Sequence, residues 1–349
     1  MKVLVTGAAG FIGSNLVHYL AAERPSWEVT SLDALTYAGN LSNLRALSEQ
    51  GKLKFVRGDI TDSELIAKLF CEEQYDLVLH LAAESHVDRS IMSASEFVKT
   101  NVLGTQVLLN ATLGIHRGSD SVKAKKIRFV HISTDEVYGS LGPTGLFHET
   151  TPLEPTSPYA ASKAASDMMV LAAVRTHHLD ALVTRCTNNY GPYQFPEKFI
   201  PLFVTNCLEG KKLPLYGSGT NVRSWIHVKD HCEGLVLAAE KGRAGEAYNI
   251  GSDSSGEVPN VDVARRIMKL LGVADSQLEL VTDRPGHDFR YAVDFSKATR
   301  ELGWKPRTGF EEGLAATVNW YKENLSWWQE IKSGAYRSYY EENYMARSK

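Results

Sequence analysis

Short apolar runs alternate with longer amphipathic stretches over the first half of the chain. The runs have the length of strands and lie at residues 3–5, 28–32, 54–56, 77–80, 128–132 and 181–184. Helix-like spacing of apolar residues occupies the intervals, at residues 12–24, 63–73, 94–114 and 159–176. Such alternation is typical of a parallel sheet covered by helices on both faces. With right-handed crossovers, it predicts an α/β fold built on a doubly wound, Rossmann-type parallel sheet.

The pattern becomes less regular after about Tyr190. Glycine, proline and aromatic residues interrupt it between Gly191 and Gly219, and an apolar helix and strand-like runs recur within residues 225–250. The remainder of the chain is helical and rich in loops, which suggests a second domain. We predict a Rossmann domain of residues 1–190, to which 225–250 returns, and a smaller C-terminal substrate-binding domain of residues 191–224 and 251–349.

Composition excludes several classes of protein. The 349 residues are 43% hydrophobic and 23% charged, with a formal net charge of −3, so no nucleic-acid partner is expected. The apolar runs are shorter than the roughly 20 residues of a membrane span. The chain enters a strand at once, so we expect no signal peptide and a cytoplasmic location. The four cysteines lack C-x-x-C spacing, and His227, His231 and Cys232 lack further ligands, so we predict free thiols and no metal site.

A glycine-rich turn follows the first predicted strand. Gly7, Gly10 and Gly13 would allow a tight turn and close backbone approach, and the helix N-terminus that follows would face a phosphate. A structural turn can use the same residues, but the order of strand, glycines and helix favours a dinucleotide site. Asp33 ends the second strand, where a carboxylate binds ribose hydroxyls and repels a 2′-phosphate. Because residues 34–36 include no arginine, we predict NAD⁺ rather than NADP⁺.

Residues after the next two strands extend this hypothesis. Asp59 and Ile60 follow the third strand and could border the adenine, although a helix cap explains them nearly as well. Leu81, Ala82 and Ala83 follow the fourth strand. Small residues at that position let the backbone run close to a cofactor.

Tyr159 and Lys163 are four residues apart on a predicted helix, so they share a face. A nearby ammonium stabilises a phenolate and lowers the tyrosine pKa, and the lysine can also bind the nicotinamide ribose. This spacing is common by chance, but its place after a Rossmann half favours a catalytic pair. Thr134, at the end of the fifth strand, supplies a hydroxyl that can bind the substrate hydroxyl being oxidised.

Two acids, Asp135 and Glu136, directly follow Thr134. Within a strand they would point to opposite faces, but just past its end both can face a cleft. A simple dehydrogenase does not need them. Oxidation of a sugar C4 hydroxyl acidifies the C5 hydrogen, which a carboxylate can then remove while a carboxylic acid protonates the departing C6 hydroxyl. The pair therefore predicts a lyase in which hydride returns to C6 and NAD⁺ is regenerated.

Taken as a set, these motifs resemble the extended short-chain dehydrogenase/reductase family and, within it, the nucleotide-sugar 4,6-dehydratases. The resemblance runs from Met1 to about Tyr344 and includes residues 35–40, 82–90, 133–139, 157–163, 188–193, 195–198, 213–217 and 283–288. It implies bound NAD⁺, dTDP-glucose as the substrate, and a homodimer built on the helices at 94–114 and 159–176.

The resemblance also implies residue roles. Asp135 would be the acid for the leaving hydroxyl, Glu136 the base at C5, and Tyr159 the base at the C4 hydroxyl. NAD⁺ contacts would fall on Phe11, Ile12, Asp33, Ala34, Leu35, Thr36, Asp59, Ile60, Leu81, Ala82, Ala83, Thr100, Tyr159, Lys163 and Asn189. Substrate contacts would fall on Ser85, Thr134, Asn188, Lys198, Phe199, Pro214, Leu215, Tyr216, Arg223, Asn260, Arg284, His287, Asp288 and Tyr344.

Physical arguments support part of this set. Arg223 and Arg284 suit a diphosphate, and Tyr216 could stack on a pyrimidine, although Arg284 could also brace a turn and Tyr216 could be a core residue. Two departures, Ser224 where the family has Asp and His227 where it has Tyr, put the fine tuning for the substrate in doubt.

Three other functions compete with this hypothesis. A dehydratase of a UDP- or GDP-linked hexose differs little, because one thymine methyl contributes only about 1–3 kcal/mol of discrimination. A 4-epimerase shares the glycines, the tyrosine and the lysine, but has no use for the acid pair. A non-catalytic NAD-sensing protein would have no need of Tyr159 and Lys163, and both are present.

Overall fold

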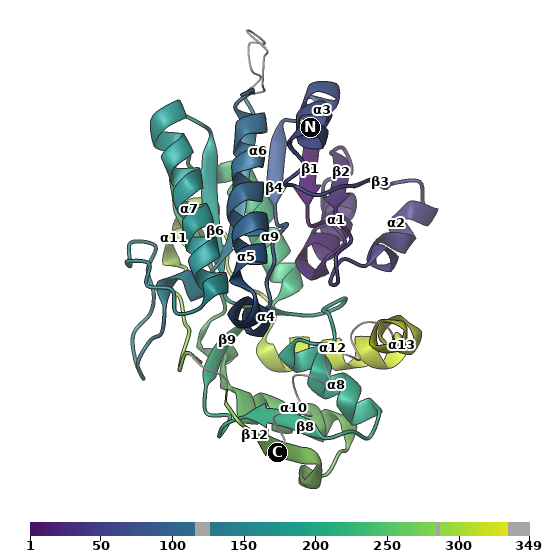
Figure 1. Cartoon of the computed structure of the whole chain (residues 1–349). Coiled ribbons are helices and arrows are strands. Elements are labelled where there is room, and N and C mark those ends of the chain that lie inside the picture. The colour runs from purple at the N-terminus through teal and green to yellow at the C-terminus, as the bar shows by residue number, and fades with distance from the viewer. Residues whose placement is uncertain (116–125, 284–286, 334–349) are drawn as a thin grey trace.

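A seven-stranded parallel sheet organises the larger layer of the structure, a computed structural model that describes residues 1–115, 126–283 and 287–333 (Figure 1). The strand order is β10-β6-β5-β4-β1-β2-β3. The strands are β1 (Lys2–Thr6), β2 (Glu28–Asp33), β3 (Lys54–Arg57), β4 (Leu77–His80), β5 (Arg128–Thr134), β6 (Ala181–Cys186) and β10 (Ala247–Ile250). The chain winds outward from β1 to one side and from β4 to the other. The predicted doubly wound α/β fold is confirmed.

Helices cover both faces of this sheet because successive strand residues belong to opposite cores. Val3 and Val5 pack into a core with α1 (Phe11–Glu23) and α9 (Val228–Lys241). Leu4, between them, packs into a second core on the other face. That core contains residues of α3 (Ser63–Glu73), α6 (Gly104–Thr112) and α7 (Pro158–His177). A strand buried on both faces explains the continuous apolar runs of the sequence.

The single helix predicted at residues 94–114 is divided in the structure. It comprises α5 (Ala94–Phe97), a π-helical turn η2 (Val98–Leu103) and α6. The carbonyl of Asn101 accepts hydrogen bonds from the hydroxyls of Thr105 and Ser166, at 2.6 and 2.7 Å. Its side chain binds both backbone groups of Glu84, at 2.8 and 3.0 Å. These contacts favour the wider turn, a feature often found at functional sites.

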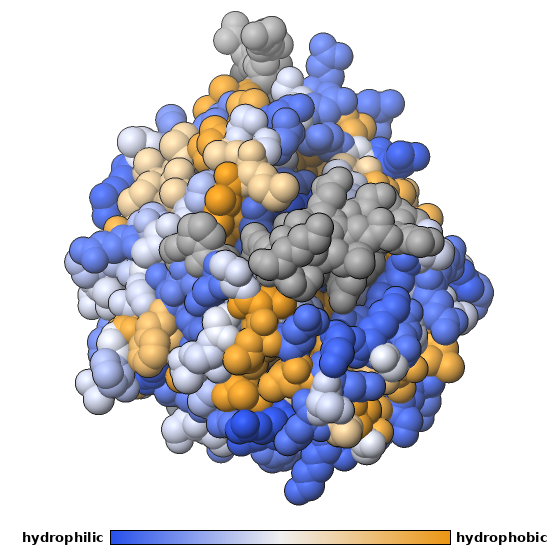
Figure 2. Space-filling model, turned by 60° about the horizontal axis from the view of Figure 1, so that its bottom comes forward, coloured by the Kyte–Doolittle hydropathy of each residue, from blue (hydrophilic) through white to orange (hydrophobic). Residues whose placement is uncertain are grey.

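A smaller layer lies below the carboxyl ends of the large sheet (Figure 1). One sheet has the order β11-β9-β7, and β12 pairs with β8 in another. The strands are β7 (Asn188–Tyr190), β8 (Leu213–Tyr216), β9 (Val222–His227), β11 (Glu257–Pro259) and β12 (Leu278–Val281). They share an aromatic-rich core with α8 (Phe199–Leu208), α10 (Asn260–Leu271), α12 (Phe310–Glu323) and α13 (Leu325–Ser333). Figure 2, seen from this side, shows hydrophobic patches within a largely hydrophilic surface.

The segment 225–250 contributes to both layers. Strand β9 pairs with β7 and β11 in the small sheet, so the predicted strand at 225–228 does not join the large sheet. Helix α9 packs against α1, and β10 pairs with β6. The proposed domain boundaries therefore remain a prediction, with the segment divided between the layers.

Short elements complete the fold. The remaining helices are α2 (Arg45–Glu49), α4 (Val87–Met92), α11 (Ser296–Leu302) and the 3₁₀ helices η1 (Leu41–Leu44), η3 (Asp135–Tyr138), η4 (Ser254–Gly256) and η5 (Asp275–Gln277). All four cysteines are free thiols. Among the described residues, no helix combines the length and the apolar character needed to cross a membrane.

A fully buried ion pair joins α7 to the large sheet. Arg185 of β6 donates to Asp167 of α7 at 2.9 Å, and their side chains are 3% and 0% exposed. Arg185 also donates to the hydroxyl of Tyr138 at 2.9 Å. This ion pair therefore holds the helix that carries Tyr159 and Lys163 on the sheet. Removal of either partner would strongly destabilise the fold, because the other charge would stay buried and unpaired.

We expect Arg185→Leu to lower the free energy of unfolding by about 3–5 kcal/mol, because Asp167 would be left buried without its cation. Urea unfolding measures the loss. Arg24→Ala is the control, since it breaks the 2.7 Å surface pair with Glu240 and should cost less than about 1 kcal/mol. Equal losses in the two variants would contradict the argument.

Candidate active site

A cleft of about 320 Å³ lies at the carboxyl ends of β1, β2, β4, β5 and β6. Ligands of open α/β sheets bind at this edge, where the strand order reverses. The turn after β1 forms one wall of the cleft. Residues that lead into the smaller layer also line the cleft: Cys186, Thr187, Asn188, Asn189, Gln194, Phe195, Glu197 and Lys198.

The turn after β1 requires its glycines. Gly7 has a φ of +69°, and a Cβ there would lie 2.7 Å from the backbone nitrogen of Ala82. A Cβ on Gly13 would lie 2.0 Å from the carbonyl oxygen of Gly7. Helix α1 starts after Gly10 without a capping side chain from the described residues. Its N-terminus therefore presents backbone donors and a positive dipole to an anion in the cleft.

Asp33 lies beside this turn at the end of β2. Its carboxylate accepts backbone hydrogen bonds from Ala9 at 2.9 Å and from Leu35 at 2.8 Å. Burial raises the pKa of the Asp33 carboxyl, and the backbone donors oppose that shift. The carboxylate is thereby held at the position predicted for ribose recognition.

The structure brings the predicted cofactor residues together. All of them line the cleft except Leu35, which contributes its backbone N–H to Asp33. Thr100 reaches the lining from the π-helical turn, far from the glycines in sequence. Buried oxygens of Asn188 and Gln194 also lie in this lining without hydrogen-bond partners among the described residues. The donor set and these acceptors fit a dinucleotide.

Strand β5 ends at Thr134 and the chain turns at once into η3. The Thr134 hydroxyl caps this turn by accepting from the backbone N–H of Glu136 at 3.3 Å. It also donates to Asp135 at 3.3 Å. Asp135 and Glu136 both line the cleft, as do Tyr159 and Lys163. The predicted constellation is therefore assembled at one place.

Electrostatics separates the roles open to these groups. Burial, followed by the neighbouring charge of Glu136, raises the pKa of Asp135 well above its ordinary value. Both causes favour the protonated carboxylic acid of Asp135 over its carboxylate. A carboxyl held neutral in a buried site can donate a proton to a leaving group.

The contacts of the Lys163 ammonium differ from those predicted from the sequence. Its ammonium donates to the carbonyl of Ile132 at 2.8 Å and lies 3.5 Å from His131 Nε2. Burial lowers the Lys163 pKa to about 8. Burial and then the charge of Glu136 raise the pKa of Tyr159 well above its ordinary value. The predicted lowering of the tyrosine pKa by the lysine is not what this arrangement produces, because the ammonium lies against the end of β5.

The predicted substrate residues fall into two groups. Ser85, Thr134, Asn188 and Lys198 line the cleft, and Lys198 donates to the Ser85 carbonyl at 3.0 Å, which joins the two layers. The others lie outside the lining and are Phe199, Pro214, Leu215, Tyr216, Arg223, Asn260, His287 and Asp288. Arg284 and Tyr344 lie outside the described residues.

Contacts within the protein engage several residues of the second group. Arg223 is 5% exposed and donates to the carbonyls of Val222 and Asp288, at 2.8 and 3.1 Å. Tyr216 donates to Asp88 at 3.0 Å. The Leu215 side chain is buried in the core of the small layer, so only its backbone is placed to meet a ligand.

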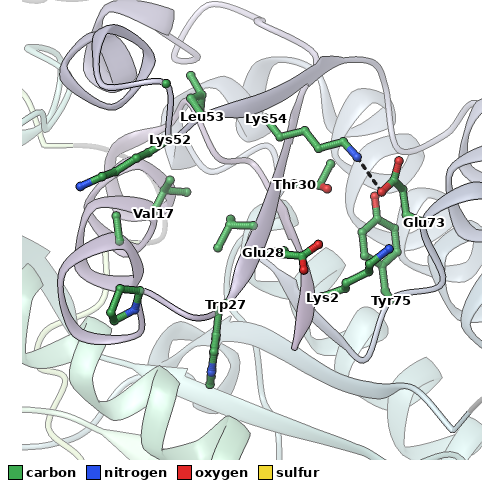
Figure 3. A pocket seen from close by; sticks show the side chains of 14 residues that line it. Lys2, Val17, Trp27, Glu28, Thr30, Lys52, Leu53, Lys54, Glu73 and Tyr75 are labelled. Atoms are coloured by element: carbon green, nitrogen blue, oxygen red, sulfur yellow. Dashed lines mark ion pairs between the residues drawn. The ribbon is translucent and has the colours of Figure 1, made fainter.

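A second cavity, of about 420 Å³, opens at the opposite edge of the large sheet (Figure 3). Its lining includes Trp27 and Tyr75, and Lys54 and Glu73 form a 2.6 Å ion pair across it. None of the predicted site residues contributes to this cavity. The catalytic and cofactor-binding residues predicted from the sequence therefore lie at the cleft and not at this second cavity.

The chain is similar in sequence to known proteins over nearly its whole length. A family model described as GDP-mannose 4,6 dehydratase matches residues 4–317. The dTDP-glucose 4,6-dehydratase of Streptomyces niveus is 50% identical over 337 residues, which cover 95% of this chain and 96% of the relative. The Escherichia coli enzyme of the same name is 48% identical, covering 99% and 100%.

A crystal structure agrees in both fold and sequence. DesIV from Streptomyces venezuelae, described as a dTDP-glucose 4,6-dehydratase with NAD and TYD bound, has a TM-score of 0.89 and 51% identity. The match covers 95% of this chain and 100% of that one. This chain belongs to the dTDP-glucose 4,6-dehydratase family.

For this member of the dTDP-glucose 4,6-dehydratase family, the cleft contains residues that sequence reasoning missed. Tyr37, Glu84, Phe195 and Glu197 lie inside motifs that carried the resemblance, so those motifs were the available signal. Cys186 had a weaker signal, since it ends a strand beside β5. Gln194 had none, because only the path of the chain after Tyr190 places it in the cleft.

We expect Gly7→Ala to abolish NAD⁺ binding, because its Cβ would collide with the backbone at Ala82 and force the turn open. Equilibrium titration with NAD⁺ measures the affinity. Gly51→Ala is a matched control, with a φ of +67° and nothing within 4 Å of the added Cβ. Both variants carry the same backbone strain, so an equal loss of affinity would contradict a local steric cause.

Proposed function

We propose that the protein is an NAD⁺-dependent dTDP-glucose 4,6-dehydratase, which converts dTDP-glucose to dTDP-4-keto-6-deoxyglucose and water. The observation that carries this proposal is the meeting of Asp135 and Glu136 with Tyr159 and Lys163 in one cleft that also contains the glycine turn and Asp33. An oxidation at C4 needs only the tyrosine and lysine. Elimination across C5–C6 needs a separate acid and base, and the cleft contains both.

The glycine turn, Asp33 and Lys163 would hold NAD⁺. The cofactor would accept a hydride from C4 and return it to C6, so that no external oxidant is consumed. The backbone donors at the start of α1 would bind its diphosphate, and Asp33 would accept from a ribose hydroxyl. Lys163, held against Ile132, would bind the second ribose with its remaining N–H donors.

Each remaining group has one proton to move. Tyr159 would take the proton of the C4 hydroxyl, and Thr134 is predicted to lie beside the same hydroxyl. Glu136 would remove the C5 hydrogen and later return a proton to that carbon. Asp135, whose pKa burial raises, would protonate the departing C6 hydroxyl. Asp135 must be protonated and Glu136 ionised for these roles. Their unequal burial supports this difference, since Asp135 is buried and Glu136 is half-buried.

The chemistry of the acid pair favours dehydration over 4-epimerisation, which needs neither Asp135 nor Glu136. The choice of dTDP-glucose over a UDP- or GDP-linked hexose rests on the similarity to dTDP-glucose 4,6-dehydratases over nearly the whole chain. DesIV, a member with TYD bound, supports the thymidine nucleotide. The predicted roles of Tyr216, Arg223 and Asn260 in holding that nucleotide remain part of this proposal.

We also propose a homodimer in the cytoplasm. Figure 1 shows α7 beside the column formed by α5 and α6, on the outside of the large sheet. Apolar side chains on this surface are exposed, among them Val98 at 55%, Leu103 at 51% and Met168 at 48%. Exposed apolar side chains on neighbouring helices are typical of a protein–protein contact, and a second copy of the chain would cover them.

We expect kcat to fall as the pH rises through about 8, because Lys163 loses its proton near that value and can no longer act as an ammonium donor. The charged form exists below this pKa, so activity is present on the acid side and lost on the alkaline side. A pH profile of kcat measures the midpoint. Lys163→Arg keeps a cation and should lose this limb, although its absolute rate should fall because the guanidinium has a different shape.

A single incubation tests the proposed reaction. The protein, with bound NAD⁺ and no added oxidant, is given dTDP-glucose in deuterated water, and the product is examined by NMR and mass spectrometry. We expect a 4-keto-6-deoxy sugar with deuterium at C5, because Glu136 exchanges its proton with solvent before returning it. Recovery of dTDP-galactose, or no turnover, would rule the proposal out. Parallel UDP- and GDP-glucose reactions test the choice of nucleotide.

Glu136→Gln isolates the elimination step. The variant should still oxidise C4, seen as reduced nicotinamide absorbance on substrate addition, but should form at least about 10²-fold less product. Glu323→Gln, at an exposed carboxylate on α12, is the control for the charge change. Full product formation by Glu136→Gln would show that another group removes the C5 hydrogen.

A further inference from the structure

Ala9 lies within the glycine turn after β1 but does not line the cleft. Its backbone N–H donates to the Asp33 carboxylate at 2.9 Å. Its carbonyl accepts from the backbone N–H of Asn40 at 3.0 Å and from Asn43 Nδ2 at 2.9 Å. Both backbone groups of Ala9 are therefore engaged, so the path of the turn depends on contacts that come from outside it.

The Asn43 amide joins this turn to another part of the chain. Asn43 is 2% exposed, and its Oδ1 accepts from the indole N–H of Trp327 at 2.8 Å. A backbone carbonyl can only accept and an indole N–H can only donate. The two partners, the Ala9 carbonyl and the Trp327 indole, therefore fix the orientation of the amide. The backbone carbonyl of Asn43 is held separately by His18 Nε2 of α1, at 2.7 Å.

Trp327 belongs to the small layer. It lies on α13 and packs against the aromatic-rich core of that layer. Its ring contacts those of Trp320 and Tyr193, with centroids 5.1 and 6.0 Å apart. Tyr193 in turn stacks on His18, at 5.7 Å and with 9° between the ring planes. These aromatic contacts fix the position of the Trp327 indole relative to α1 of the large layer.

The backbone of Tyr193 supports the importance of this contact. Its φ is +66°, in the left-handed region that non-glycine residues rarely adopt. Such a conformation persists only where the surrounding structure holds it. A hydrogen bond from Asn15 of α1 to the adjacent Pro192 carbonyl, at 2.9 Å, holds the same segment. The two layers are therefore joined by several contacts where Trp327 reaches Asn43.

We propose that Asn43 is a positioning residue that keeps the glycine turn in its NAD⁺-binding conformation, and that the Trp327 indole holds Asn43 in place. The inference rests on the part of the proposed function that assigns the glycine turn to NAD⁺. Neither Asn43 nor Trp327 lines the cleft, so both act through Ala9. A helix of the small layer thereby contributes to the affinity for the cofactor.

Preorganisation explains how such a contact changes affinity. A turn that is already ordered binds its ligand without a further loss of conformational entropy. Without the indole donor, the buried Oδ1 of Asn43 would have lost its partner, which is unfavourable. The amide would then leave this orientation in part of the molecules and release the Ala9 carbonyl. The apparent dissociation constant for NAD⁺ rises as the fraction of molecules with a competent turn falls.

Trp327→Phe tests the contact, because it removes the indole N–H and keeps an aromatic ring. We expect the dissociation constant for NAD⁺, measured by equilibrium titration of the full chain, to rise about fivefold, the contribution of one buried hydrogen bond. Trp320→Phe is the matched control. It makes the same change in the same aromatic cluster without removing a donor to Asn43, and should leave the NAD⁺ affinity unchanged.

Asn43→Asp tests the other half of the contact. An ionised carboxyl would present an oxygen to the Ala9 carbonyl in place of the N–H donor, so NAD⁺ should bind poorly at about pH 9. At about pH 5 the introduced carboxyl gains a proton that it can donate, and the affinity should recover. The measure is the ratio of the dissociation constants of the variant and the wild type, which removes any pH dependence that both share.

The affinity for dTDP separates positioning from a general loosening of the small layer. Trp327→Phe should weaken NAD⁺ binding and leave dTDP binding unchanged. A parallel loss of both affinities, an equal effect of the two tryptophan substitutions, no effect of Trp327→Phe, or a ratio for Asn43→Asp that does not change with pH would each overturn the proposal. If Asn43→Asp does not fold, the pair of tryptophan variants still decides.

Failure of the proposed function would look different. If the wild type binds NAD⁺ but not dTDP, the proposed substrate is wrong, and the positioning role is still judged from the NAD⁺ affinities. If Gly7→Ala binds NAD⁺ as the wild type does, the assignment of the glycine turn to the cofactor is wrong, and the positioning role fails with it.

Discussion

The hydrogen bond from the Glu136 N–H to the Thr134 hydroxyl is the contact on which the active site depends. It ends β5 and starts a 3₁₀ turn, in which two consecutive acids can face the same cleft. A strand continued by one residue would send Asp135 and Glu136 to opposite faces of the sheet. The same hydroxyl donates to Asp135 at 3.3 Å, so one side chain both caps the turn and contacts the proposed acid.

Burial then shifts the pKa values of the catalytic groups toward their neutral forms. Asp135 lies in a low-dielectric environment that favours its neutral form, and Lys163 lies in one that weakens its charge. Such groups are costly to a fold, and the structure offsets the cost with paired and hydrogen-bonded neighbours. The Asp167–Arg185 pair and the contact of Lys163 with the Ile132 carbonyl hold α7 against β5 and β6. Stability and catalytic geometry therefore depend on the same buried contacts.

Most of the large layer could be predicted because its signals are local. Each strand is a short apolar run that both faces of the sheet require, and the glycines follow from backbone geometry that holds in any sequence context. The π-helical turn at Val98–Leu103 could not be predicted, because Glu84, Ser162 and Ser166 stabilise it from other parts of the chain. The pairing of the strand at 225–228 within the small sheet could not be predicted for a similar reason. Its partners, β7 and β11, are short and have no strong pattern of their own.

The sequence by itself determined the parallel fold, the dinucleotide turn and the chemical identity of the groups at the end of β5. These features depend on residue type and on spacing within one or two elements. Only the tertiary structure decided which groups share an environment. It buried Asp135, turned the Lys163 ammonium toward Ile132 and engaged Arg223 with backbone carbonyls. Desolvation and hydrogen-bond partners come from residues distant in the chain, so the pKa of each group was settled by packing.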